Sequence, residues 1–108
     1  MKITLISNDN FSKLLEIYNN NPILTLQNKG YEEIGLRNEL TDTDKEQIKE
    51  VSTILREAIF GFSRFQNFRL NKDNEIQLRF QYNWEIEGGV PFVGVGYILL
   101  DELLNGFR

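Results

Sequence analysis

Residues 75–87 alternate between apolar and polar side chains without interruption. The apolar positions, all of one parity, are Ile76, Leu78, Phe80, Tyr82, Trp84 and Ile86. Successive side chains of a β-strand point to opposite faces, so this segment has one apolar face and one polar face. A strand buried on both faces would be apolar throughout. The pattern therefore predicts a sheet with one packed face and one face open to water.

Segments on both sides of this strand predict a meander. Residues 65–70 and 90–96 are rich in aromatic and β-branched side chains, and polar or glycine-rich turns at 71–74 and 88–89 separate them from residues 75–87. Consecutive strands joined by short turns pair antiparallel. Pro91 favours an edge position for the last strand. Further strands are predicted at Lys2–Ile6 and Ile23–Gln27, and a weaker one at Tyr31–Leu36.

Three segments have the apolar spacing of amphipathic helices. The first, about residues 9–19, follows the N-cap candidates Ser7, Asn8 and Asp9. The second, about residues 43–60, opens with a capping box of Thr43 and Glu46 and ends near Gly61. The third, about residues 98–105, repeats leucines and stops at Asn105–Gly106.

Together these elements predict an α+β fold. It is a two-layer sandwich, in which the helices about 9–19, 43–60 and 98–105 pack on one face of an antiparallel sheet about 65–70, 75–87 and 90–96. No linker or repeat divides the chain, so residues 1–108 are expected to form a single domain. No apolar run is long enough to cross a bilayer, and the N-terminus lacks a signal sequence. A cytoplasmic protein is therefore expected.

The composition narrows the chemistry. The chain has no cysteine and no histidine, which excludes thiolate nucleophiles, histidine bases and their usual metal sites within one chain. No catalytic residue, cofactor or metal site is predicted. The net charge is −4 and the pI about 4.8, which favours a protein partner with a basic surface. The same charge argues against direct binding of nucleic acid or an anionic membrane.

The polar face of the long strand has one candidate for chemistry. Glu85 and Glu87 lie about 7 Å apart on that face, close enough for a carboxylate pair or for part of a divalent cation site. A solvated sheet face with ion pairs explains them better, and a partner-binding face comes second.

Three other motifs have competing interpretations. The aromatic and arginine residues of Phe60–Arg69 can contact nucleic acid or a protein, but Phe62, Phe65 and Phe68 are too many to expose, which favours a core. Gly94 and Gly96 weakly suggest a phosphate loop and better suit a bent strand or a close-packed helix. The acids of Asp42–Glu46 resemble a calcium loop without its glycine, and helix capping explains them.

The favoured function is a small acidic protein-binding module. Its size, charge and lack of catalytic groups suit a stoichiometric inhibitor or an immunity-type protein, bacterial or phage-encoded, that neutralises a toxin or a nucleic-acid-acting defence enzyme. The expected partner-binding residues are Arg79, Gln81, Asn83, Glu85, Glu87, Glu32, Glu33, Glu39 and Asp42.

Two alternatives stay open. One is a self-assembling module that forms a homodimer through the sheet edge at 90–97. The other is an enzyme that uses a carboxylate pair, or a carboxylate with Tyr82 or Tyr97, in a cavity between sheet and helices.

Overall fold

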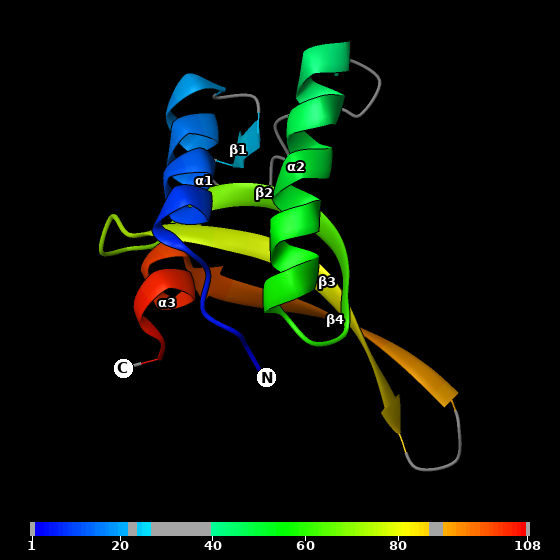
Figure 1. The fold of residues 1–108 in the computed structure, drawn as a ribbon. Helices are drawn as coiled ribbons and strands as arrows, with labels where there is room; N and C mark the ends of the chain where they lie inside the picture. The colour runs from blue at the N-terminus through cyan, green and yellow to red at the C-terminus, as the bar shows by residue number, and fades with distance from the viewer. Residues whose placement is uncertain (1, 22–23, 27–39, 87–89, 108) are drawn as a thin grey trace.

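Three helices lie on one side of a curved sheet in the computed structural model (Figure 1). The model describes residues 2–21, 24–26, 40–86 and 90–107, apart from the side chains of residues 26, 84–86, 90 and 91. The elements are α1 (Asn8–Asn20), β1 (Thr25–Leu26), α2 (Asp42–Ala58), β2 (Phe62–Leu70), β3 (Ile76–Ile86), β4 (Val90–Leu99) and α3 (Leu100–Asn105). The predicted α+β fold with helices on an antiparallel meander is confirmed. The strand expected at 31–36 lies outside the described residues.

The sheet contains the predicted meander and β1, which confirms a strand within the predicted range Ile23–Gln27. Its order is β1-β2-β3-β4, and β2, β3 and β4 pair antiparallel. The two-residue β1 pairs parallel with β2, so that Thr25 lies opposite Phe68. Parallel neighbours need a long crossover connection, and here that connection contains α2.

Two bulges in β2 turn its phenylalanines to the same face. Phe62, Phe65 and Phe68 are three residues apart, so a regular strand would send Phe65 to the other side. Register shifts between Phe62 and Arg64 and between Phe65 and Asn67 each insert an extra residue. Bulges also bend a strand, and Figure 1 shows β2 curving. Phe65 and Phe68 are buried and Phe62 packs against them, which confirms that these three belong to the core. The strand begins three residues earlier than predicted.

The core lies between the sheet and all three helices. Its fully or nearly buried members from the helices are Leu14, Ile17, Val51, Ile54, Leu55, Ala58, Leu100 and Leu103, and those from the meander are Phe65, Phe68, Leu78, Phe80 and Ile98. Leu78 and Phe80 have no exposed surface, as the alternating pattern predicted. Tyr18 of α1 adds an edge-on contact with the Phe68 ring at 5.6 Å between centroids.

The start of α2 differs from the prediction. Its N-cap is Thr41, whose hydroxyl accepts a hydrogen bond from the Asp44 amide at 3.1 Å, while Asp44 Oδ2 accepts one from the Thr41 amide at 2.9 Å. The capping box therefore consists of Thr41 and Asp44, and the assignment of Thr43 and Glu46 is wrong. The helix ends at Ala58 rather than near Gly61, which has a φ of 79° and lies in the turn to β2.

The N-terminal segment is not the predicted strand. Ile3 forms only an isolated bridge with Ile59. The Thr4 amide donates to the Ala58 carbonyl and the Ile6 amide donates to the Leu103 carbonyl, at 2.6 and 2.7 Å. These acceptors belong to the helices α2 and α3, so no ladder can propagate along the segment.

The C-terminal helix starts two residues later than predicted, because β4 continues through Leu99. Ile98 pairs with Leu78 and is buried against it, so the strand conformation keeps an apolar side chain in the core. The predicted stop holds, since Gly106 follows α3 with a φ of 90°. None of the described helices is long and apolar enough to span a membrane.

Candidate functional site

The candidate site is the outer face of the meander, defined as the side of β2, β3 and β4 that points away from the helices. Core residues of β3 have even numbers, so its odd-numbered side chains point outward. The register aligns them with outward side chains of both neighbouring strands. The resulting rows across the sheet are Arg69–Gln77–Leu99, Asn67–Arg79–Tyr97, Arg64–Gln81–Val95 and Asn83–Val93.

Tyr97, on the edge strand β4, is the aromatic residue in the described rows of this face. The guanidinium carbon of Arg69 lies 4.9 Å from the Tyr97 ring centroid, and that of Arg79 lies 5.9 Å from it. Both distances are within the range of a cation–π interaction. The Tyr97 side chain is still 41% exposed, so one part of it holds the arginines in place while another part stays open to a partner.

Two polar atoms in the row Asn67–Arg79–Tyr97 have no hydrogen-bond partner. Asn67 is 8% exposed, and its Oδ1 is buried and unbonded. Arg79 Nε, across the β2–β3 register from Asn67, is also buried and unbonded. An unsatisfied buried polar atom costs about 1–3 kcal/mol, so a ligand group or bridging water that reached them would be stabilised there.

The β4 part of the outer face is apolar. Val93 and Val95 are 58% and 43% exposed, and with Tyr97 they form a stripe along the strand. On the opposite face of β4, the alternate positions are Gly94 and Gly96. A Cβ at either glycine would lie 2.8 Å from the ring of Tyr82 or Phe80 respectively, so the glycines make room for rings of β3.

The described part of this face is basic rather than acidic. Its charged side chains are Arg64, Arg69 and Arg79, and no Asp or Glu occupies the described rows. Glu75, just before β3, is engaged in the turn, where it bonds with Asn71. Large aromatic and arginine side chains are the types enriched at the centres of protein interfaces.

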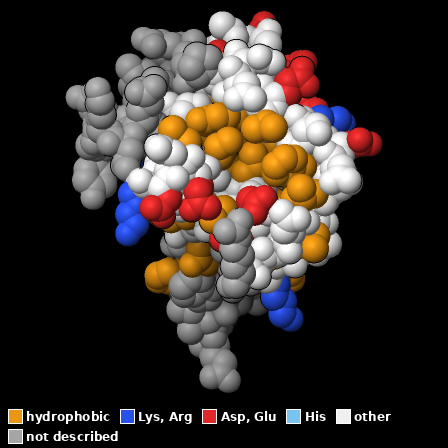
Figure 2. All heavy atoms as spheres, turned by 90° about the vertical axis from the view of Figure 1, so that its left-hand side faces the viewer, with side chains coloured by type: hydrophobic (Ala, Val, Ile, Leu, Met, Phe, Trp, Pro, Cys, Tyr) orange, Lys and Arg blue, Asp and Glu red, His pale blue; other side chains and the backbone are white. Residues whose placement is uncertain are grey.

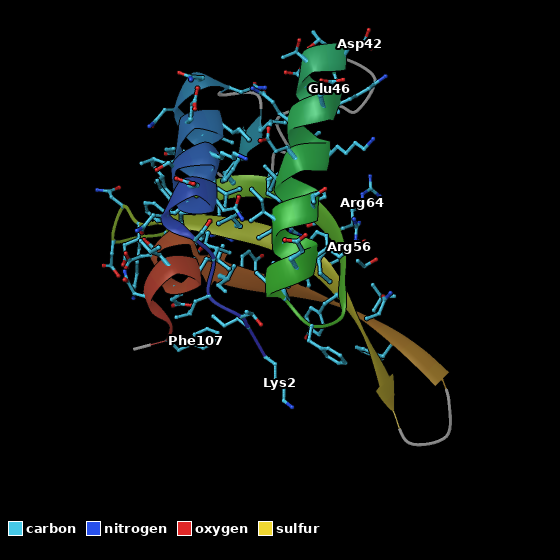
Figure 3. The ribbon with its side chains drawn as sticks, in the orientation of Figure 1. Lys2, Asp42, Glu46, Arg56, Arg64 and Phe107 are labelled. Atoms are coloured by element: carbon cyan, nitrogen blue, oxygen red, sulfur yellow. The ribbon has the colours of Figure 1, made fainter. Side chains whose placement is uncertain are left out.

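The structure brings together part of the predicted partner-binding set. Arg79, Gln81 and Asn83 form one row along β3 on the outer face, as expected. Asp42 lies elsewhere: Figure 3 places it, with Glu46, at the end of α2 that points away from the sheet, while Arg56 lies toward the other end of the helix and Arg64 belongs to β2. The remaining predicted acids fall outside the described residues or side chains: Glu32, Glu33, Glu39, Glu85 and Glu87.

Sequence reasoning missed the residues that complete the face. The sequence places Arg69 in the aromatic and arginine segment Phe60–Arg69 but does not indicate its position beside Tyr97. Val93 and Val95 were not assigned to a surface. One signal could have found them: Gly94 and Gly96 share one parity of β4, which leaves the other parity as a continuous row of large side chains.

A buried polar cluster joins α1 to α2 away from this face. Asn21 Nδ2 donates to Asp44 Oδ1 at 2.6 Å and to Gln47 Oε1 at 2.5 Å. The hydrogen bonds from the Thr41 backbone and then from Asn21 hold the pKa of Asp44 below its usual value of 3.8, against the effect of burial. Both carboxylate oxygens of Asp44 thus accept hydrogen bonds within the cap and the cluster. This agrees with the interpretation that the acids of Asp42–Glu46 cap the helix.

The other motifs lead to no site among the described residues. No group of three or more Asp or Glu is placed to hold a metal ion there. Gly94 and Gly96 lie inside a paired strand, so they do not form a phosphate loop. Figure 2 shows hydrophobic side chains gathered on the side where α1 and α3 lie. The half-buried Phe11, Leu15 and Tyr18 of α1 pack against the core, so they mark its border.

Comparisons with known proteins found no match, whether among protein-family models, curated proteins or solved structures.

Proposed function

We propose that this protein is a protein-binding module that docks a partner on the outer face of its meander. The observation that carries the proposal is the exposed Tyr97 ring, which the guanidinium groups of both Arg69 and Arg79 approach. Tyrosine and arginine are enriched among binding hot spots, because they combine a large contact area with directed hydrogen bonds. The sheet beneath keeps these side chains in register before a partner arrives, which lowers the entropic cost of binding.

The described outer face favours a partner that offers carboxylates next to apolar side chains. The arginines supply charge complementarity and the β4 stripe supplies apolar contact area. A basic partner, expected from the net charge, would use acids such as Asp42 on the helical layer, or Glu85 and Glu87, whose side chains lie outside the described ones. Variants of the described arginines and of the helical acids can separate an acidic partner on the outer face from a basic partner on the helical layer.

The biological role we propose is stoichiometric inhibition. A small, acidic chain without histidine or cysteine suits a protein that acts by covering another protein, as an immunity-type or phage-encoded inhibitor in a bacterial cytoplasm would. The target would be a toxin or a defence enzyme whose docking surface is acidic or aromatic.

The test is affinity capture with matched variants, followed by binding measurements on the purified partner. Tyr97→Ala removes the central ring, and Arg69→Glu reverses a charge beside it. Lys49→Glu reverses the same charge on an exposed position of α2, far from the outer face in the sequence and on the opposite layer. We expect a partner that binds wild type and Lys49→Glu alike.

Each outer-face variant should reduce the binding free energy for that partner by about 2 kcal/mol, which raises Kd about thirtyfold. Circular dichroism shows whether the variants stay folded. A partner that binds all four proteins equally would overturn the proposal. Tight binding of a single-stranded oligonucleotide that is lost in Tyr97→Ala would also overturn it, in favour of base stacking on the same ring.

A further inference from the structure

The far edge of β4 (Val90–Leu99) is free within the described part of the chain, because the sheet order ends at this strand. The direction of the β4 backbone groups follows from the neighbouring strand β3, where two hydrogen bonds show which residues face β2. The Asn83 amide donates to the Gly61 carbonyl at 2.8 Å, and the Glu75 carbonyl accepts from the Asn71 amide at 3.0 Å. Both bonds run toward β2. Backbone groups alternate between the two sides of an antiparallel strand, so odd-numbered β3 residues bond to β2 and even-numbered ones to β4.

The β3–β4 register has no shift and carries this parity to the edge. The odd-numbered pairs are Asn83 with Val93, Gln81 with Val95 and Arg79 with Tyr97. The N–H and C=O groups of Val93, Val95 and Tyr97 therefore point away from β3, toward the free edge. Pro91 has the same parity, so its missing N–H also falls on the free side, where a proline costs no hydrogen bond of the sheet.

Apart from Pro91 near its start, this edge lacks the usual protection against pairing. Natural edge strands are short, bulged or charged, whereas β4 has ten residues, no bulge against β3 and no charged side chain. The residues with free backbone groups, Val93, Val95 and Tyr97, also hold the exposed apolar side chains. A strand added here would gain hydrogen bonds and apolar contacts from the same residues.

We propose that β4 pairs antiparallel with β4 of a second copy of this chain, about a twofold axis at Val95. In this register Val95 lies opposite Val95 of the other copy, and Val93 lies opposite Tyr97. All of these residues have free backbone groups, so each pair exchanges two hydrogen bonds. The pattern of valine, glycine, valine, glycine and tyrosine is self-complementary, as an isologous contact requires.

A second copy fits this edge better than an unrelated strand for two reasons. No charge on β4 repels its own copy across the axis. On the inner face Gly94 meets Gly96 of the other copy, so no side chain obstructs the approach. The dimer joins two meanders into one continuous sheet with a single outer face. The inference does not rest on the proposed function, because it concerns the strand edge and a different partner.

Sedimentation velocity tests the dimer directly. Wild type should shift with concentration toward twice the 12.7 kDa of the chain. Val95→Lys places two positive charges opposite each other at the axis and should raise the dimer Kd at least about tenfold. Gln81→Lys is the control, because it adds the same charge to the same face one strand away from the edge. A wild type that stays monomeric at all concentrations, or a dimer that Val95→Lys leaves intact, overturns the proposal.

Cross-linking tests the register. The chain has no cysteine, so a single introduced thiol can react only with its counterpart in another copy. At the axis, the two thiols of Val95→Cys lie within reach of a short bifunctional reagent. The thiols of Val93→Cys lie about 14 Å apart, since four residues of strand separate them. Efficient cross-linking of Val95→Cys and poor cross-linking of Val93→Cys is the expected result. Equal yields from the two variants would overturn the register and the proposal with it.

Discussion

At Gly96, the absence of a side chain makes room for the Phe80 ring. A Cβ there would lie 2.8 Å from Phe80 Cζ, and Phe80 is completely buried, so the ring cannot move aside cheaply. Gly96→Ala should therefore lower the free energy of unfolding by about 1–3 kcal/mol through overpacking.

Gly94→Ala is the matched control. Its Cβ would meet the Tyr82 ring at the same 2.8 Å, but Tyr82 is half-buried and can give way. The lower backbone entropy of alanine offsets part of the remaining cost. Urea denaturation followed by circular dichroism measures both variants, and equal losses would contradict the explanation.

Asp44 should make stability depend on pH in the acid range. Hydrogen bonds lower its pKa in the folded state, so its stabilising contribution is fully present above the ordinary value of 3.8 and is lost as pH falls through the lowered value. Asp44→Asn removes this contribution. It also replaces Asp44 Oδ2, which accepts a hydrogen bond from the Thr41 amide, with an NH2 group that cannot accept one. Its Tm should lie below that of wild type at neutral pH, and the gap should narrow toward pH 2.

Asp42→Asn provides the comparison for this measurement, because Asp42 is exposed in the same helical turn. At neutral pH, the Tm of Asp42→Asn should lie closer to that of wild type than the Tm of Asp44→Asn does. Thermal melts over a pH series decide the matter: a difference between wild type and Asp44→Asn that stays constant with pH would refute the assignment.

Among the elements, α2 shows why the sequence was ambiguous about a helix start. Thr41 with Asp44 and Thr43 with Glu46 both satisfy the capping-box spacing. The contact that selects the first pair comes from Asn21, twenty-three positions away in the chain, whose amide holds Asp44. Local pattern therefore predicted that a helix begins here, and tertiary contact decided at which residue.

The capping assignment predicts different effects for two similar substitutions. Thr41→Ala removes the N-cap hydroxyl and should cost about 1 kcal/mol, or roughly 4 °C in Tm. Thr43→Ala changes an exposed residue inside the helix and should stay within about 0.5 kcal/mol of wild type. Thermal melts of the two variants side by side provide the test, and the reverse order of stability would restore Thr43 as the cap.

The strands also differ in how far their local sequence pattern predicted them. β3 was predicted almost to the residue, because strict alternation between turns leaves one interpretation. β2 was not, because its phenylalanines have a spacing that fits neither regular period until bulges are inserted. For the same reason, the row of Arg79, Gln81 and Asn83 was predictable from parity. The positions of Arg64 and Arg69 on β2 were not predictable, because they depend on the register between β2 and β3.

At the scale of the molecule, the net charge conceals a separation of the described charged residues onto two sides. The described acids lie mainly on the helices, and the outer face of the sheet carries arginines. The acids of this group on α2 are Asp42, Asp44, Glu46, Glu50 and Glu57. A partner steered by the net charge of −4 would approach the helical layer, and a partner steered by the local field would approach the sheet.

Association rates can tell these two modes of docking apart. For a partner on the outer face, Arg69→Glu should lower the association rate constant and flatten its dependence on salt, because it removes one of the steering charges. Glu50→Lys, on the exposed side of α2, should leave the rate unchanged or raise it slightly by weakening repulsion of an acidic partner. Stopped-flow measurements over a salt series give both slopes. If Glu50→Lys slows association and Arg69→Glu does not, the partner binds the acidic helical layer, and the outer face of the sheet is not the docking surface.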